Sequence, residues 1–219
     1  MVYNLLFFDI ETVPDSLDDD LMIPCKLGKL TDPKKIAAKE AEWGTGGQIK
    51  AHSVSPYHNK IVALEMYTQD QYGNQFIEGL KDSVSAEKNL LDDFHSRIQQ
   101  VDYIIGFNIL NFDLPSIMFR SAMLGVKSTP ISLRRYSTKP VVDLMEILAG
   151  WNPQNRKSLN WFLKRFGIGE KSGDGGQVYD MYKAGKMDEI REYCRKDVEL
   201  TKELFYRVAE VYLPGILLF

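Results

Sequence analysis

The feature that most constrains the fold is a short apolar run near the start of the chain, which ends abruptly in an acid. Tyr3 to Phe8 is almost wholly apolar, and Asp9 follows it directly. A continuous apolar run of this length is typical of a strand that is buried on both faces. It therefore predicts the central strand of a sheet, which the rest of the chain must cover.

The remaining sequence alternates further strand and helix patterns. Strands are expected at residues 61–67, 75–78, 103–108 and 141–144. Helices are expected at residues 33–43, 87–100, 113–124, 158–166 and 188–211. This alternation predicts an α/β fold whose first strands pair as an antiparallel meander. Because no repeat and no clear linker is present, we expect one domain, residues 1–219, with an insert of uncertain structure at about residues 14–59.

Composition narrows the class of protein. No segment has the apolar length that spans a bilayer, and the N-terminus lacks the features of a signal peptide, so we expect no membrane association. Cys25 and Cys194 are the only cysteines, which predicts two free thiols and a cytoplasmic location. A net charge of −3 argues against a protein that holds nucleic acid through phosphate contacts alone. It is compatible with an enzyme whose bound cations meet the phosphate.

Acidic residues follow the predicted buried elements at three places. Asp9 and Glu11 leave the end of the first strand two residues apart, so their side chains point to the same side. Asp113 stands between a predicted strand and a predicted helix. Tyr193 and Asp197, four residues apart, share one face of the last helix. Each place alone has an ordinary explanation, such as a solvated turn, a helix cap or a surface position.

Together and in this order, the three places resemble the exonuclease motifs of the DEDD (DnaQ-like) superfamily. The matching segments are Phe8-Asp9-Ile10-Glu11-Thr12, Asn108-x-x-x-Phe112-Asp113 and Tyr193-x-x-x-Asp197. The tyrosine before the last aspartate resembles the proofreading exonuclease domain of family-B DNA polymerases, and we expect a stand-alone relative because no polymerase domain fits in the chain. The resemblance implies a ribonuclease H-like mixed sheet, an antiparallel meander plus parallel strands flanked by helices. It covers most of the chain and is weakest in the insert.

The resemblance implies a 3′–5′ exonuclease that hydrolyses phosphodiester bonds and releases nucleoside 5′-monophosphates. Asp9, Glu11, Asp113 and Asp197 are expected to hold two divalent cations, Mg²⁺ or Mn²⁺, which both prefer oxygen ligands. We expect Asp9 to bridge the ions, Glu11 and Asp197 to hold the ion that activates water, and Asp113 to hold chiefly the other. Tyr193 would orient that water or the scissile phosphate, since its ordinary pKa makes it a poor base.

Other residues are expected to support this site or the substrate. The resemblance implies main-chain contact of Thr12 with the terminal nucleotide, and a substrate hydrogen bond or a turn-capping role for Asn108. Phe112 is a substrate-binding candidate that also fits a core position, and Asp143 either supports the ligands from behind or caps a helix. A further group of basic and aromatic side chains could contact phosphates and bases. These are Arg134, Arg135, Lys139, Arg156, Lys157, Lys164, Arg165, Trp151, Trp161 and Phe162.

The choice of polymer stays open. The resemblance favours DNA, in single-stranded form, and allows a replication or repair protein as a partner. The first alternative is a 3′–5′ exoribonuclease of the ribonuclease D type, because no contact to a 2′-OH can be read from the sequence. The second is a catalytically inactive fold that serves as a nucleic-acid-binding or scaffold module, although none of the expected metal ligands is missing.

Overall fold

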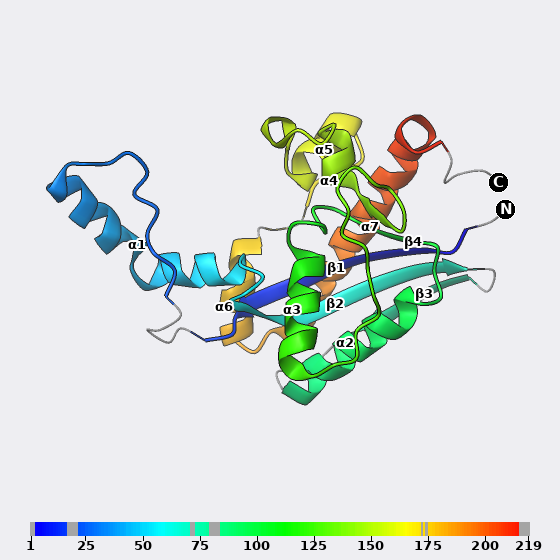
Figure 1. Ribbon diagram of the computed structural model, residues 1–219, viewed down its shortest axis with the longest axis horizontal. Helices are drawn as coiled ribbons and strands as arrows, with labels where there is room; N and C mark the ends of the chain where they lie inside the picture. Colours follow the sequence, from blue (N-terminus) through cyan, green and yellow to red (C-terminus); the bar gives the residue numbers. More distant parts are fainter. Residues whose placement is uncertain are drawn as a thin grey trace.

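A mixed sheet forms the centre of the protein (Figure 1). The computed structural model describes residues 3–16, 22–70, 73–78, 84–171, 173 and 175–214, and this part of the chain contains five strands in the order β3-β2-β1-β4-β5. The strands are β1 (Leu5–Pro14), β2 (Asn59–Asp70), β3 (Gly73–Glu78), β4 (Tyr103–Gly106) and β5 (Val141–Asp143). β1, β2 and β3 form an antiparallel meander, whereas β4 and β5 continue the sheet in parallel with β1. The predicted α/β mixed sheet is confirmed.

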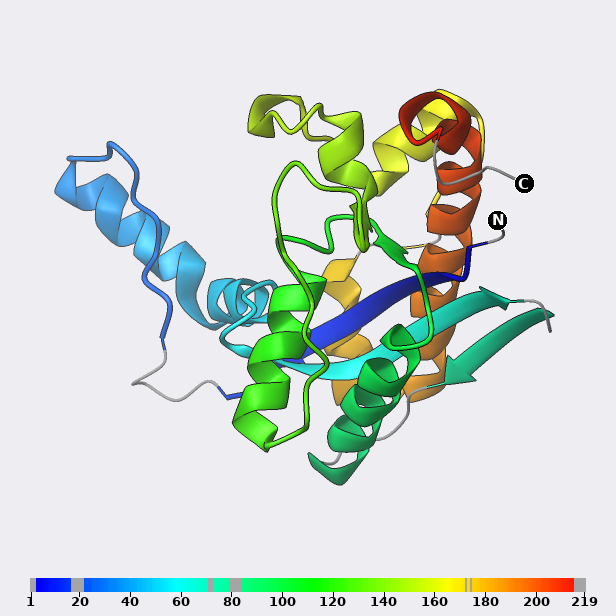
Figure 2. The ribbon, with the colours of Figure 1, turned by 45° about the vertical axis from the view of Figure 1, so that its right-hand side comes forward.

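Helices cover both faces of this sheet, with α2 and α3 on one face and α5 and α7 on the other (Figures 1 and 2). The helices are α1 (Pro33–Ser53), α2 (Val84–Ile98), α3 (Asp113–Leu124), α4 (Leu144–Leu148), α5 (Leu159–Phe166), α6 (Val178–Lys183) and α7 (Met187–Tyr212). Two short 3₁₀ turns are η2 (Pro153–Asn155) and η3 (Gly175–Gln177). Within the described ranges, none of the helices has both the length and the apolar character that crossing a membrane requires.

β1 is buried on both faces because its alternate side chains enter two separate cores. The ring of Phe7 packs against Phe205 of α7 with the ring centroids 5.3 Å apart. The ring of Phe8 packs against Phe94 of α2 at 5.0 Å on the opposite face. The predicted central strand is confirmed, and it extends beyond the predicted end at Phe8 because pairing with β2 continues to Pro14.

The insert contains a longer helix than the sequence predicted. Helix α1 runs from Pro33 to Ser53, and it starts at Asp32, whose side chain accepts a hydrogen bond from the backbone N–H of Lys34 at 2.9 Å. Gly44, with φ +32° and ψ −151°, is not helical and divides α1 into two pieces. The first piece therefore ends where the sequence predicted, near residue 43, whereas the second piece, which continues to Ser53, was not predicted. Helix α1 packs against β1 and β2.

The other predicted elements are present with small shifts in their bounds. α4 and α6 were missed, because helices of five or six residues are too short to show an amphipathic period. A glycine-rich stretch, residues 169–176, separates α5 from α6, and its residues 172 and 174 fall outside the described part of the chain.

Candidate active site

Four acids from three distant parts of the sequence meet beside β1. Asp9 and Glu11 lie on the same face of β1 as Phe7, so strand alternation directs them toward α7. Asp113 is the first residue of α3, and Asp197 lies on the buried side of α7. The four interact electrostatically, since the charges of Asp9, Asp113 and Asp197 all raise the pKa of Glu11. The structure thus brings together the four residues that the sequence predicted as metal ligands.

Burial and mutual repulsion raise the pKa values of these carboxyl groups. Burial, assisted by the charge of Asp197, raises the pKa of Asp9 to about 7. Burial and the charge of Asp9 raise the pKa values of Glu11 and Asp113 well above their ordinary range. Oδ1 of Asp113 is buried and has no hydrogen-bond partner among the described residues. Buried carboxylates that repel one another are suited to bind divalent cations. Such cations offset the repulsion and are coordinated by carboxylate oxygens that have no other partner.

Asp9 is at the electrostatic centre of the four. Its charge raises the pKa values of both Glu11 and Asp113, and its own pKa is raised by Asp197. Groups that interact this strongly titrate as a set, so binding or loss of a cation at one carboxylate changes the charge state of the others.

Lys171 is a site residue that the sequence did not single out. Its Nζ lies 2.5 Å from Oδ2 of Asp197 and 5.1 Å from the centroid of the Tyr193 ring. Burial lowers its pKa, but Asp197, Tyr193 and Asp9 outweigh that effect, so the net pKa is raised and the amine stays charged. A single lysine in a glycine-rich loop shows no spacing or period that would have marked it as part of the site.

Tyr193 is buried on α7 one turn before Asp197. Burial raises its pKa to about 12, and the nearby amine of Lys171 opposes part of that shift. The hydroxyl is buried and makes no well-formed hydrogen bond to any described residue, although Lys171 is close enough to act on it. Tyr193 is therefore a neutral hydrogen-bond donor near neutral pH and not a base.

Cys194 lies against the acids without adding a soft ligand to them. Ligand atoms of Asp9, Glu11 and Cys194 all lie within 4.8 Å of one another. The thiol donates to the backbone oxygen of Asp9 at 3.3 Å, and its Sγ lies 3.8 Å from Oδ2 of the same residue. Burial and the neighbouring acids raise the pKa of Cys194 well above its usual value. The thiol therefore stays protonated, and the donor set consists of oxygen atoms.

Asp143 has the capping role that the sequence allowed, and it also binds the loop before α3. Its Oδ1 accepts from the backbone N–H of Met145 at 3.0 Å, which caps α4. The same oxygen accepts from the N–H of Asn108 at 2.9 Å, and Oδ2 accepts from that of Leu110 at 2.9 Å. Asn108 has the unusual φ of +66°, so these bonds hold a strained turn in place. Asp143 thereby fixes the loop that leads to Asp113.

The three substrate-binding candidates lie near the acids, but their side chains have partners in the protein. The hydroxyl of Thr12 donates to the backbone oxygen of Ser53 at 2.6 Å, which ties β1 to the end of α1. Oδ1 of Asn108 accepts a hydrogen bond from the side chain of Asn111 at 3.2 Å. Phe112 is half-buried against the core under α2 and α3.

Several of the basic and aromatic candidates have partners within the protein or lie in its core. Arg156 forms an ion pair with the buried Glu146, and Lys164 pairs with Glu170 at 2.9 Å. Phe162 is a core residue, whereas the ring of Trp161 is exposed and meets Phe162 edge-on. Trp161 therefore lies outside the core, because helix α5 directs its ring outward while Phe162 faces the sheet.

Solved structures of two kinds are similar to this chain. The family B DNA polymerase from the hyperthermophilic archaeon Pyrobaculum calidifontis matches with 20% identity and a TM-score of 0.56, over 95% of this chain and 25% of that chain. Apo exonuclease I matches with 13% identity and a TM-score of 0.43, over 99% of this chain and 44% of that chain. The chain thus spans a quarter of the length of the polymerase, with which it shares the fold. No curated protein sequence matches it.

A protein-family model also matches this chain and identifies its family. Residues 53–212 match the family described as a predicted 3′–5′ exonuclease related to the exonuclease domain of PolB. The matched region contains Asp113, Tyr193 and Asp197, and the strand β2 in it pairs with the strand that carries Asp9 and Glu11. Because the match extends over most of the chain, this protein belongs to that family of predicted 3′–5′ exonucleases.

Proposed function

We propose that this chain is an active 3′–5′ exonuclease that removes nucleotides from single-stranded DNA with the help of two divalent cations. The observation that carries the proposal is the convergence of Asp9, Glu11, Asp113 and Asp197, with raised pKa values and an unpartnered oxygen on Asp113. Buried acids that repel one another destabilise a fold unless a cation offsets their charge. This arrangement supports a metal-dependent enzyme over an inactive scaffold.

The donor set fits Mg²⁺ or Mn²⁺, because the free donors are carboxylate oxygens and the neighbouring thiol of Cys194 stays protonated. Asp9 would be shared between the ions, since it interacts with each of the other three acids. The four carboxylates would hold these ions, which when bound would supply activation of the attacking water and stabilisation of the charge on the departing 3′ oxygen.

Other residues of the chain would position the substrate for this attack. Tyr193 offers a neutral hydroxyl without a well-formed hydrogen bond, which can donate to the attacking water or to a phosphate oxygen. Lys171 holds the carboxylate of Asp197 and lies over the Tyr193 ring, so it fixes both side chains and adds positive charge next to the phosphate. Asp143 keeps the Asn108 turn, and with it the start of α3, in place.

DNA is the proposed polymer because the family is related to the exonuclease domain of a DNA polymerase. The test uses 5′-labelled DNA and RNA of one sequence, as single strands and as duplexes, with Mg²⁺, Mn²⁺ or EDTA. A ladder that shortens from the 3′ end of single-stranded DNA, and that EDTA abolishes, is the expected result. Faster digestion of RNA would change the substrate class, and no digestion of either polymer would refute the activity.

Two variants show whether the four acids carry the reaction. Asp9→Asn removes the charge that all other acids interact with and keeps the size of the side chain, so we expect activity to fall by at least about 10³-fold. Asp93→Asn makes the same change at an exposed position of α2 and serves as the matched control. Activity of Asp9→Asn near the wild-type level would contradict the assignment of the site.

A further inference from the structure

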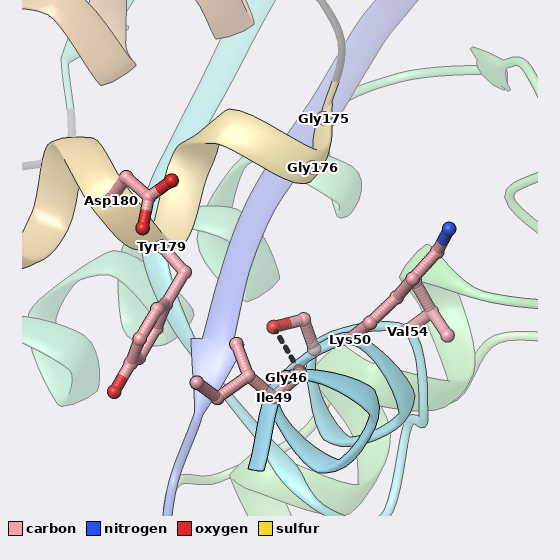
Figure 3. Close-up of a pocket in the computed structure, with 9 residues that line it drawn as sticks. Gly46, Ile49, Lys50, Val54, Gly175, Gly176, Tyr179 and Asp180 are labelled. Carbon is pink, nitrogen blue, oxygen red and sulfur yellow. Dashed lines mark hydrogen bonds between the residues drawn. The ribbon is translucent and has the colours of Figure 1, made fainter. Parts of the chain in front are cut away.

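A pocket of about 640 Å³ lies beside the candidate active site, between the second piece of α1 and the segment formed by η3 and α6 (Figure 3). The α1 wall consists of Gly46, Ile49, Lys50, Ser53 and Val54. The opposite wall consists of Gly175, Gly176, Tyr179 and Asp180. Both α1 and α6 pack against β1, the strand that carries the first two acids. None of the four acids lines the pocket itself.

Each wall is connected to the candidate active site by a short path. On the α1 side, the backbone oxygen of Ser53 accepts the hydrogen bond from Thr12, which directly follows the second acid of β1. On the other side, Gly175 is two residues from Gly173, which lies so close to Tyr193 that an added Cβ would be 3.4 Å from the ring atom Cε2. Both walls of the pocket are therefore connected to residues of the candidate active site.

The lining of the pocket suits a nucleotide. Ile49 and Val54 offer apolar surface, and Tyr179 offers an aromatic ring on which a base can stack. Lys50 supplies a cation for a phosphate, and Asp180 supplies an acceptor for the amino or hydroxyl groups of a base or sugar. At Gly46 and Gly175 an added Cβ would meet nothing within 4 Å, so open space remains where side chains would otherwise stand.

Residues 22–53, which include α1, are rich in lysine, and the first piece of α1 projects away from the sheet (Figures 1 and 2). Residues 22–53 contain six lysines and three acids, although the chain as a whole has a net charge of −3. The lysines are Lys26, Lys29, Lys34, Lys35, Lys39 and Lys50, and the acids are Asp32, Glu40 and Glu42. The acidic run at residues 18–20 belongs to the undescribed part of the chain. A lysine-rich segment beside the pocket complements a polyanionic strand.

We propose that this pocket binds one nucleotide of the substrate strand, with the base against Tyr179 and the neighbouring phosphate at Lys50. The inference rests on the proposed exonuclease function and identifies where this chain holds the strand near the acids. The family match begins at residue 53, so almost all of α1 lies outside it. The pocket therefore combines a wall from the matched region, which includes Tyr179, with Gly46, Ile49 and Lys50 of α1, which lie outside it.

Binding measurements test the pocket independently of cleavage. A fluorescein-labelled oligothymidylate with phosphorothioate linkages at its 3′ end is titrated with each variant in Mg²⁺, and fluorescence anisotropy gives the affinity. We expect Tyr179→Ala to weaken binding roughly tenfold and Tyr179→Phe, which keeps the ring, to bind as the wild type does. We expect Lys50→Ala to weaken binding and to reduce the slope of log affinity against log salt concentration by about 0.7.

Lys127→Ala is the matched control, because Lys127 is exposed beyond the end of α3 and does not line the pocket. It should leave both the affinity and the salt slope unchanged. A thermal melt of each variant establishes that it is folded. If Tyr179→Ala and Lys50→Ala bind like the control, the pocket does not hold the strand and the inference is wrong.

A separate assay distinguishes failure of the pocket from failure of the proposed function. The wild-type protein is tested for Mg²⁺-dependent hydrolysis of bis(p-nitrophenyl) phosphate, a small phosphodiester that has no base. Hydrolysis of this compound together with unaltered binding by the Tyr179 and Lys50 variants would overturn the pocket alone. No hydrolysis of this compound or of oligonucleotides would overturn the exonuclease function on which the inference rests.

Discussion

Replacing Asp9 by asparagine should stabilise the metal-free protein while it abolishes activity. Burial and the neighbouring Asp197 raise the pKa of Asp9 from 3.8 to about 7 in the folded state. The folded protein therefore binds this proton more tightly than the unfolded chain does. Stability from this group is present in full below pH 3.8 and is lost as the pH rises from 3.8 to about 7. Asparagine has no charge to lose over this range.

The size of the effect follows from the shift in pKa. A difference of about three pKa units corresponds to about 4 kcal/mol, since each unit is worth 1.36 kcal/mol. This is an upper value, because the coupled carboxyl groups of Glu11, Asp113 and Asp197 readjust their protonation when Asp9 is neutral. In EDTA at pH 8 we expect Asp9→Asn to be more stable than the wild type by about 2–4 kcal/mol, and at pH 4 the two should be nearly equal.

Urea denaturation at pH 4, 6 and 8 measures this difference, first in EDTA and then in saturating Mg²⁺. Mg²⁺ should stabilise the wild type strongly and Asp9→Asn much less, because a ligand that binds only the folded state raises its stability. Asp93→Asn, at an exposed position, controls for the change in net charge. If Asp9→Asn is less stable than the wild type at pH 8 in EDTA, the account of repelling buried acids is refuted.

Three further predictions concern the charged residues Lys171, Asp143 and Arg120. Lys171→Met should lower kcat at least about tenfold in the nuclease assay, because the amine of Lys171 holds Asp197 at 2.5 Å. Lys171→Arg keeps the positive charge and should restore part of the rate. Equal rates for both variants would count against a positioning role. Asp143→Ala should destabilise the protein by about 2–4 kcal/mol in urea, because it removes the acceptor for several backbone N–H groups. Arg120→Ala should destabilise it by about 3–5 kcal/mol, because Glu87, whose oxygens lie 2.8 and 2.6 Å from the guanidinium, is left buried without its partner. A change in the free energy of unfolding below about 1 kcal/mol for Asp143→Ala or Arg120→Ala would contradict these estimates.

The sequence by itself determined the parts of the protein that depend on local pattern. The apolar run before Asp9 predicted a central strand, since only a strand covered on both faces tolerates continuous apolar residues. The spacing of two between Asp9 and Glu11, and of four between Tyr193 and Asp197, predicted shared faces because strand and helix geometry repeat at those intervals. The same short-range patterns placed most helices and strands, whereas α4 and α6 were too short to show one.

The tertiary structure alone decided which other groups meet the acids. Cys194 reaches them because α7 packs against β1, and Lys171 reaches them through its ion pair with Asp197 of α7; no local pattern encodes these contacts. Asp143 both caps α4 and holds the Asn108 turn because β4 and β5 are neighbours in the sheet. The kinked α1 joins the site through Thr12 for the same reason. The acids are specified by spacing along the chain, but their pKa values and their partners come from packing between segments far apart in sequence.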